Sequence, residues 1–239
     1  MDGRTVVVHV RKSRRARKMR LVVAPGRAPE VVLPERVPHR AVEGFLRGNQ
    51  RWLADKLAAL EALDRRPAVL PGRAGVVCVA GEAVTVVPGA AGRSRVVLRD
   101  GRLVVDGAPA DAEAAVDRWY RREARRRLAG AIEEHAPALS VQVAAISVRD
   151  QRTRWGSASR NGRLSFSWRL VLAPPPVLTY VVQHELCHLR DFNHSPAFWK
   201  LVESVRPDWR EPARWLREHG HELHAYRPRL DLTPTQPYP

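Results

Sequence analysis

The chain has 239 residues, 44% of them hydrophobic, which is enough for one packed domain or for a catalytic domain with a smaller companion. Its 41 Lys and Arg residues outnumber 25 Asp and Glu residues, and this net charge of +16 favours polyanionic partners without identifying them. The composition excludes a wholly disordered chain, a disulfide scaffold built on two cysteines, and a membrane span, because no apolar run is long enough. Since no secretory signal is recognisable either, we expect a cytoplasmic protein.

Residues 1–108 are expected to form a β-rich N-terminal region with one helix at about 38–64. Short strands at 6–10 and 19–23 are joined by a segment without any acidic residue, a basic arm that is a candidate for binding nucleic acid. The candidate residues of this arm are Arg11, Lys12, Arg14, Arg15, Arg17 and Lys18. Glycine turns then separate further strands at 76–79, 83–87, 95–98 and 103–105.

Residues 109–225 are expected to form the catalytic domain. It opens with a helix at about 111–135, whose arginine-rich side we interpret as a solvated face rather than a dedicated binding stripe. Strands at 145–155 and 163–172 flank Asn161-Gly162, a strong signal for a β-hairpin. Three prolines at 174–176 then lead into an apolar helix.

The last part of the chain is expected to be helical and then irregular. Ser195-Pro196 favours the start of another helix, because serine caps and proline fits the first turn. A short helix is expected to end at Gly220. The tail 226–239 is rich in proline, and we expect no regular structure from Arg227 onward.

The residues with the clearest chemistry are His184, Glu185 and His188, in the sequence HELCH on the apolar helix. Residues four apart on a helix lie about 40° apart around the axis and about 6 Å along it, so both imidazoles can bind one ion. Glu185 lies about 100° further around the helix axis, so it falls outside the ligand set but can reach a metal-bound water. This arrangement is typical of zinc hydrolases, in which the carboxylate activates the water.

A third ligand is needed, and His194 is the candidate. The chain is expected to turn near Asn193 before the helix that begins at Ser195-Pro196, which can return the His194 ring to the metal. The spacing from His188 equals that in metzincins, but Asp191 stands where their pattern has glycine, so we do not assign the chain to that clan. The competing interpretation, a chance pair of ordinary helical histidines, is weaker because the helix is otherwise apolar.

Several sequences outside this cluster make the chain resemble a known family. HELCH at 184–188 followed by NHSPAFW at 193–199 resembles the YgjP-like metallopeptidases, zincin-fold relatives of the SprT and WLM proteases. The resemblance extends to RTRWGS at 152–157, WRL at 168–170, WYRR at 119–122 and WLREHG at 215–220. One departure is Ala158, where the family often has cysteine, so we infer that a thiol there is not essential to the metal site.

The resemblance implies an α+β fold: a zincin-like catalytic domain with its HExxH active-site helix beside a β-hairpin, joined to the β-rich N-terminal part. It implies one Zn²⁺ per chain, held by His184, His188 and His194, with Glu185 as the catalytic acid and base. It also implies a strand beside that helix, and we expect this strand within 154–157. Candidate substrate-binding residues are Arg154, Trp155, Gly156, Ser157 and Tyr180.

The roles of these candidates have alternatives. An exposed strand edge can bind an extended peptide, and Arg154 can stabilise an oxyanion. For Trp155 and Gly156 we favour a structural role, in which the indole packs on the active-site helix and the glycine permits close approach. A structural role for Tyr180 is at least as good as a position facing the cleft.

The function that follows is that of a zinc metallopeptidase acting on proteins or peptides. Some of these substrates are expected to be bound to nucleic acid, which the basic surface of this chain would contact. The alternative is a metal-dependent nucleotide phosphohydrolase of the nucleoside triphosphate pyrophosphatase type, because zinc chemistry also serves phosphorus and a basic cleft suits anions. No glycine-rich phosphate loop or aspartate cluster supports that alternative. A binding protein without enzymatic activity would not need Glu185 beside a metal.

Overall fold

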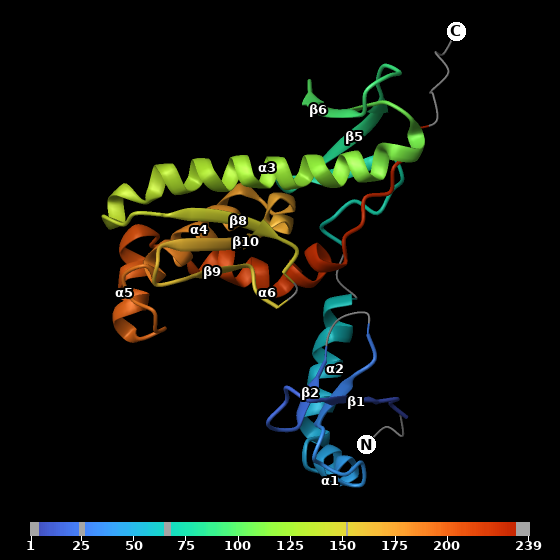
Figure 1. Cartoon of the computed structure of the whole chain (residues 1–239), viewed down its shortest axis with the longest axis vertical. Coiled ribbons are helices and arrows are strands. Elements are labelled where there is room, and N and C mark those ends of the chain that lie inside the picture. Colours follow the sequence, from blue (N-terminus) through green and yellow to red (C-terminus); the bar gives the residue numbers. More distant parts are fainter. Residues whose placement is uncertain (1–4, 24–26, 65–67, 152, 233–239) are drawn as a thin grey trace. The chain divides into compact units, whose positions relative to one another are not determined.

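A computed structural model describes residues 5–23, 27–64, 68–151 and 153–232, and the chain forms two compact units, 1–67 and 68–239. The described ranges contain six α-helices and three small sheets, a mixed α+β fold (Figure 1). Arg152 and the tail residues 233–239 lie outside them. The expected domains 1–108 and 109–225 stay a prediction. None of the described helices combines the length and the apolar character that a bilayer span demands.

The first unit is a three-stranded sheet with two helices. Strand β3 lies in the centre, parallel to β1 and antiparallel to β2. A small core of Val31, Leu33 and Val42 joins the sheet to the first helix. The elements are β1 (His9–Ser13), β2 (Arg20–Val22), β3 (Glu30–Pro34), α1 (Ala41–Gly48) and α2 (Gln50–Asp64).

Two expectations for this unit are wrong. The helix expected at 38–64 is two helices, because Asn49 ends α1 and its side-chain amide donates to the carbonyl of Phe45 at 2.8 Å. The basic arm is not entirely a connection, because Arg11 and Lys12 belong to β1, which begins at His9 rather than at residue 6. Strand β3 had not been anticipated.

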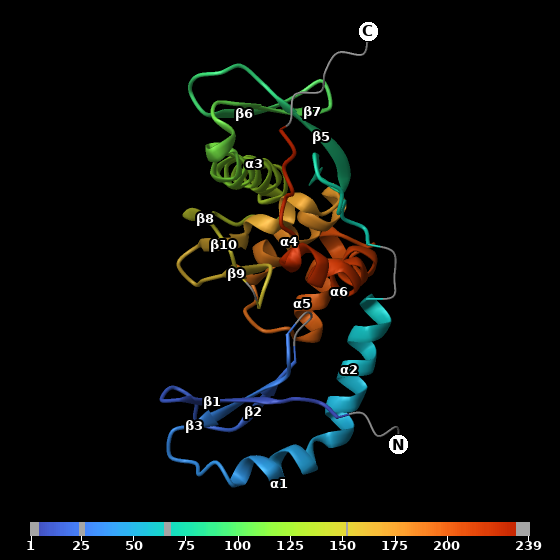
Figure 2. The same cartoon turned by 90° about the vertical axis from the view of Figure 1, so that its right-hand side faces the viewer.

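The second unit begins with a four-stranded sheet in the order β4-β5-β7-β6, at the positions expected from the sequence. The long helix α3 (Ala112–His135) contacts β6 and β7 of this sheet and also β8 and α4, so it lies between two layers (Figures 1 and 2). Its buried residues join both layers in one hydrophobic core. The strands are β4 (Val76–Val79), β5 (Glu82–Pro88), β6 (Arg95–Arg99) and β7 (Arg102–Asp106).

The third sheet contains the predicted hairpin, but with a different partner strand. Strand β9 (Gly156–Ala158) pairs antiparallel with β10 (Arg163–Ser167), and Gly162 turns the chain between them with a φ of +72°. Strand β8 (Ala145–Arg149) pairs with the other edge of β10, in parallel. The expected strand at 145–155 is therefore wrong beyond residue 149.

The expected strand at 163–172 is likewise wrong beyond Ser167. The hydroxyl of Ser167 accepts the backbone N–H of Arg169 and opens a short 3-10 helix, Trp168–Leu172. This turn buries the Arg169 guanidinium, which binds both carboxylate oxygens of Asp150, at 2.7 and 3.3 Å. The guanidinium also donates to the carbonyls of Leu223 and Tyr226, at 2.9 and 3.0 Å, so it holds the end of the last helix.

The remaining helices are α4 (Pro175–His188), α5 (Pro196–Val205) and α6 (Arg210–Ala225). Helix α4 is the centre of the unit, because it contacts α3, α5, α6 and β9. Helix α6 is longer than expected. The prediction that the chain has no regular structure from Arg227 is wrong for its described part, because Arg229 forms a β-bridge with Val76 and Leu230 packs on the core.

Candidate metal centre

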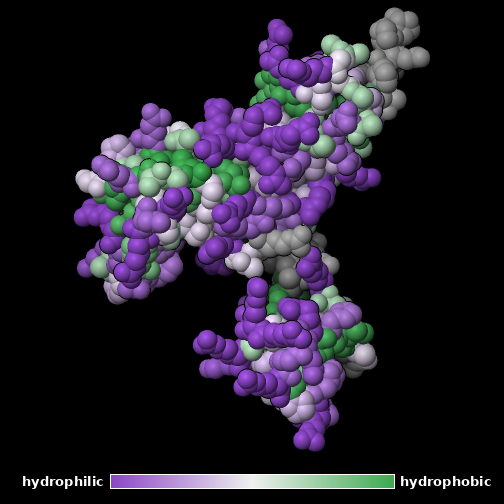
Figure 3. Space-filling view, viewed as in Figure 1, coloured by the Kyte–Doolittle hydropathy of each residue, from purple (hydrophilic) through white to green (hydrophobic). Residues whose placement is uncertain are grey.

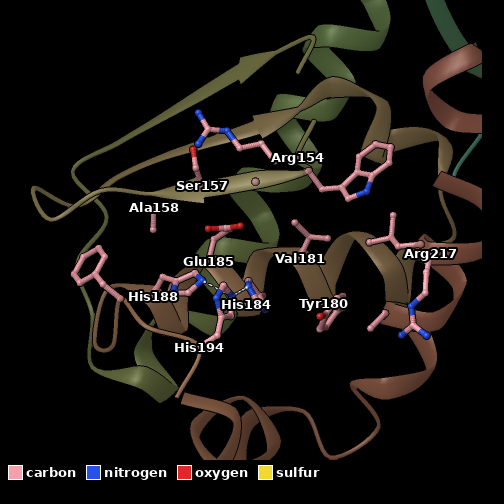
Figure 4. Close-up of a pocket in the computed structure, with 15 residues that line it drawn as sticks. Arg154, Ser157, Ala158, Tyr180, Val181, His184, Glu185, His188, His194 and Arg217 are labelled. Carbon is pink, nitrogen blue, oxygen red and sulfur yellow. Dashed lines mark hydrogen bonds between the residues drawn. The ribbon is translucent and has the colours of Figure 1, made fainter. Parts of the chain in front are cut away.

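Three imidazoles converge at the C-terminal end of α4. His184 and His188 come from the helix, and His194 from the turn after it. The Nε2 atom of His194 lies 3.2 Å from Nε2 of His184 and 3.2 Å from Nε2 of His188 (Figure 4). Three nitrogens bound to one tetrahedral zinc at about 2.0 to 2.1 Å would lie about 3.3 Å apart. Among the described residues, this is the group of His, Cys, Asp and Glu side chains that can hold a metal.

The turn that returns His194 to the helix is organised by Asp191. Its carboxylate accepts the backbone N–H of Asn193 and the hydroxyl of Ser195, each at 2.9 Å. Its carbonyl accepts Nδ1–H of His188 at 2.9 Å. These hydrogen bonds also hold the pKa of the Asp191 carboxyl below its usual range. The residue that departs from the metzincin glycine is therefore the residue that shapes this turn.

Aromatic residues of α5 hold the three rings. Phe198 is fully buried and stacks on His188, with ring centroids 4.4 Å apart, and its edge meets His184 at 5.0 Å. Trp199 stacks on His194 at 5.7 Å. The sequence analysis assigned neither residue a role at the metal. Because Nδ1 of His184 is buried without a hydrogen-bond partner among the described residues, its ring depends on such packing for its orientation.

The protonation of the cluster suits a metal. Burial, followed by the neighbouring imidazoles, lowers the pKa of His184 to about 3, and burial lowers the pKa of His188. Both rings are thus neutral at pH 7, as metal ligation requires. Since the Nδ1–H of His188 donates to a carbonyl, its Nε2 carries the free lone pair and points into the cluster. The residues present fit a bound zinc ion.

Glu185 lies between α4 and the strand β9. Only 6% of the residue is exposed, and burial raises the pKa of its carboxyl to about 7, against the charge of Arg154 and the backbone N–H of Ala158. A Cβ atom on Gly156 would lie 2.5 Å from Oε1 of Glu185. The glycine therefore permits the close approach expected from the sequence, and the carboxyl is poised to exchange a proton near neutral pH.

A cleft of about 580 Å³ contains this cluster and every candidate substrate-binding residue. One wall is β9 with the two residues before it, and the other is formed by α4 and α6 (Figure 4). Tyr180 is 8% exposed, and its ring edge meets His184 at 5.9 Å, so it is both buried and part of the wall. The described lining also includes Phe192 and Arg217, which sequence reasoning did not select.

Trp155 packs against α6, whereas the sequence analysis expected it on the active-site helix. Its indole stacks on His224 at 4.2 Å, with 14° between the ring planes. A Cβ atom on Gly220 would lie 3.0 Å from the indole, so glycine in α6 permits the contact. Since Arg169 holds the end of α6, the position of β9 beside Glu185 depends on a chain of contacts that begins at Asp150.

The candidate residues of the basic arm lie in the first unit, on β1 and the following turn. All six are exposed, and Arg11 forms a salt bridge with Glu30 at 2.9 Å. Hydrophilic residues dominate the visible face of this unit (Figure 3). Arg14, Arg15 and Arg17 form no salt bridge with other described residues.

Comparisons with known proteins place the chain in a family. A family model described as the YgjP-like metallopeptidase domain matches residues 17–219. The crystal structure of the metallopeptidase zymogen of Pyrococcus abyssi abylysin is similar at 22% sequence identity, with a TM-score of 0.35, over 38% of this chain and 93% of that chain. A search of curated proteins found no match.

Proposed function

Because the chain belongs to the YgjP-like metallopeptidase family, we propose that it is a zinc-dependent peptidase whose metal ligands are His184, His188 and His194. Glu185 is the catalytic acid and base of this proposal. The family supports a metal-dependent hydrolase that acts on peptide bonds. The observation that carries the finer assignment is the convergence of three Nε2 atoms beside a buried carboxyl group.

The chemistry divides between the ion and this chain's own residues. A bound zinc ion would supply Lewis acidity, which polarises a carbonyl and makes water acidic enough to react near pH 7. Glu185 takes a proton from the attacking water and gives it to the leaving amine. Burial raises the pKa of this carboxyl to about 7, which favours its acceptance of a proton from the attacking water.

Strand β9 is the proposed docking site for the peptide backbone. It is an edge strand, because the order of its sheet is β8-β10-β9, and it borders the cleft. An extended peptide can add to such an edge through main-chain hydrogen bonds. Gly156 and Ser157 then contact the backbone of the substrate, and Tyr180 forms the opposite wall.

Arg154 has a less direct role in this proposal. In Figure 4 its guanidinium lies beside Ser157, on the side of β9 away from the Glu185 carboxylate. Its charge opposes the effect of burial on the pKa of Glu185. This placement favours an electrostatic effect on the carboxyl group over direct contact with an oxyanion.

We also propose that the basic arm contacts nucleic acid, which would direct the peptidase to proteins bound there. The support is the exposure of Arg14, Arg15 and Arg17 without salt bridges to other described residues. Phosphate contacts of this kind weaken steeply with salt. The phosphohydrolase alternative gains no support, because the described metal-binding group contains three histidines and no cluster of acidic ligands.

Zinc analysis and hydrolysis assays on the full-length protein test the proposal. We expect close to one zinc per chain, lost in His184→Ala and kept in Glu185→Gln. Unfolded protein, DNA-bound protein and nucleoside triphosphates are the substrates to compare. Peptide cleavage that disappears in Glu185→Gln supports the proposal. Cleavage that survives this substitution, or turnover of nucleoside triphosphates alone, would falsify it.

A further inference from the structure

A second groove lies outside the metal centre, between the edge strand β6 and the helix α3. It has a volume of about 740 Å³ and is lined by residues 96–98 of β6 and by α3 residues between 119 and 129. Helix α3 contacts β7 and β6 and then continues past the edge of their sheet (Figure 1). The groove therefore lies where one further strand of this sheet would lie over the helix.

The free edge of β6 presents backbone groups without partners. The turn from β6 to β7 is Asp100-Gly101, with φ angles of +49° and +70°, which is typical of a type I′ hairpin turn. Arg99 and Arg102 face each other across this turn, and in such a hairpin the flanking pair is hydrogen-bonded. Hydrogen-bonded and non-hydrogen-bonded pairs alternate along an antiparallel ladder. The N–H and C=O groups of Val96 and Leu98 therefore point away from β7, towards the free edge.

The described part of the chain does not cover this edge. Outside the ladder with β7, neither Val96 nor Leu98 takes part in a backbone hydrogen bond with another described residue. The Leu98 residue is 37% exposed, which is high for a large apolar residue. An uncovered strand edge is a template on which another extended chain can pair.

The helix wall of the groove is basic. Arg122 and Arg125 are exposed, and Arg122 forms no hydrogen bond or salt bridge with another described residue. Arg125 uses one nitrogen to donate to the carbonyl of Ile146, at 3.1 Å. The carboxylate in the described lining, that of Glu123, is already bound by two neighbouring arginines. The sequence analysis interpreted this face of α3 as solvated, but Arg122 stands on a groove wall with its donors unused.

We infer that this groove binds an extended segment of another protein, which pairs with β6 and carries Asp or Glu at the alternate positions that face α3. Successive side chains of a strand point to opposite faces, so every second residue of the added segment would face the helix wall. Carboxylate is the group that the planar donors of arginine match best. The inference is independent of the proposed peptidase function, because this groove shares no lining residue with the cleft at the metal centre.

Two other occupants fit the groove less well. A second copy of this chain, paired through its own β6, would bring the exposed Arg95 and Arg99 of the two copies together, and like charges on facing strands repel. A nucleic acid would leave the backbone of β6 unpaired. It would also find no exposed aromatic ring in the described lining for its bases, because Trp119 is only 6% exposed.

The first experiment varies the ligand. A short fluorescent peptide in which Glu alternates with Thr is titrated into full-length Glu185→Gln, which is not expected to cleave it. The Gln-Thr counterpart and a Glu-Thr peptide with N-methylated amides are compared with it. Because charge pairs at exposed sites contribute modestly, we expect about threefold to tenfold tighter binding for Glu than for Gln, shrinking as salt rises. The N-methylated peptide should not bind, because it cannot pair with the strand.

The second experiment varies the basic wall. Arg122→Glu should abolish the preference for the Glu-Thr peptide. Arg214→Glu is the matched control, because Arg214 is also an exposed helical arginine without a hydrogen bond or salt bridge to other described residues, and it lies outside the groove lining. It should leave the preference unchanged.

The third experiment varies the strand edge. Leu98→Pro removes an outward N–H group and leaves the ladder with β7 intact, so it should abolish binding. Leu98→Ala keeps the N–H group and should bind the peptide. Circular dichroism and thermal melts establish which variants are folded, and the N-methylated peptide tests the same pairing without any change to the protein.

Each result supports or overturns the inference. Equal binding of the Glu and Gln peptides, undiminished binding of the N-methylated peptide, or equal effects of Arg122→Glu and Arg214→Glu overturns it. A single-stranded DNA oligonucleotide serves as a further probe. DNA binding that depends on Arg122, in a protein that does not bind the Glu-Thr peptide, would assign the groove to nucleic acid and overturn the inference as well.

Discussion

Residues 1–67 contain 16 basic and 7 acidic residues, whereas residues 68–239 contain 25 basic and 18 acidic residues. The excess of positive charge is thus similar in two units of very different length. In the first, Arg14, Arg15 and Arg17 are exposed without salt bridges to other described residues. In the second, arginines such as Arg127 and Arg169 are bound to carboxylates and backbone carbonyls.

The comparison shows why net charge is a poor guide to function. A guanidinium that is saturated by its own fold contributes to the formal charge but offers little to a partner. The long helix α3 illustrates this, because Glu123 binds two of its arginines. Exposed cations that form no salt bridge with other described residues, such as Arg14 and Arg15 of the basic arm, remain available to ligands. The histidine cluster adds a second difference, since all the proposed chemistry lies in residues 68–239.

The largest effect is expected for Glu185→Gln, which tests whether the chemistry is confined to the second unit. Glu185→Gln should lower kcat for peptide hydrolysis by about 10²- to 10⁴-fold, because the general acid and base is lost while zinc is retained. The triple variant Arg14→Ala, Arg15→Ala, Arg17→Ala should keep kcat on a short peptide. A comparable loss of kcat in the triple variant would show that the chemistry is not confined to the second unit.

The turn at Asp191 should be the next most sensitive position. Asp191→Ala removes the acceptor for Asn193 and Ser195, so the His194 ring loses its support, and zinc affinity should fall by about 10- to 100-fold. Competition with a chromogenic chelator measures this. Asp208→Ala, an exposed aspartate at the start of the last helix region, serves as control. Equal zinc affinity in wild type and Asp191→Ala would contradict the role assigned to the turn.

Gly156→Ala tests the contact between β9 and the Glu185 carboxyl group. The added Cβ meets Glu185, so we expect a loss of about 1 to 3 kcal/mol in unfolding free energy, together with reduced kcat. Gly130→Ala in α3 is the control, because nothing lies within 4 Å of its Cβ position and alanine favours a helix. Denaturant unfolding of both variants measures their unfolding free energies. Equal stability in the two would refute the steric argument.

The buried arginine of the second unit predicts a pH-dependent stability. Asp150→Asn should cost about 1 to 2 kcal/mol at pH 7, a value reduced for the partial exposure of Asp150. Hydrogen bonding to Arg169 lowers the pKa of Asp150 in the folded state. The contribution is therefore present above the unfolded pKa of about 3.9 and is lost as pH falls through the lower folded value. Thermal melts at pH 7 and below pH 4 should show the difference between variant and wild type shrinking.

The smallest effect on stability is expected in the first unit. Neutralising Arg14, Arg15 and Arg17 should change unfolding free energy by no more than about 0.5 kcal/mol, since exposed unpaired charges contribute little. The same variant should reduce the slope of log affinity against log salt for duplex DNA by about 0.9 for each phosphate that the arm no longer neutralises. An unchanged slope, or a protein that does not bind DNA at all, would contradict the proposal that the basic arm contacts nucleic acid.

The sequence by itself determined what depends on short spacing along one element. Helical periodicity placed His184 and His188 on one face, Asn161-Gly162 marked the hairpin turn, and Ser195-Pro196 marked the start of α5. Each signal involves residues within a turn or two of each other. Local sterics and hydrogen bonding dominate there, whatever the rest of the chain does.

Tertiary structure alone decided the relations between distant segments. The parallel pairing of β8 with β10, the stacking of Trp155 on α6 and the attachment of the tail through Arg229 join residues far apart in sequence. The same holds for the cleft that β9, α4 and α6 line. Such contacts depend on which buried surfaces fit together and on where a buried guanidinium such as Arg169 finds its acceptors, and no local pattern encodes that choice.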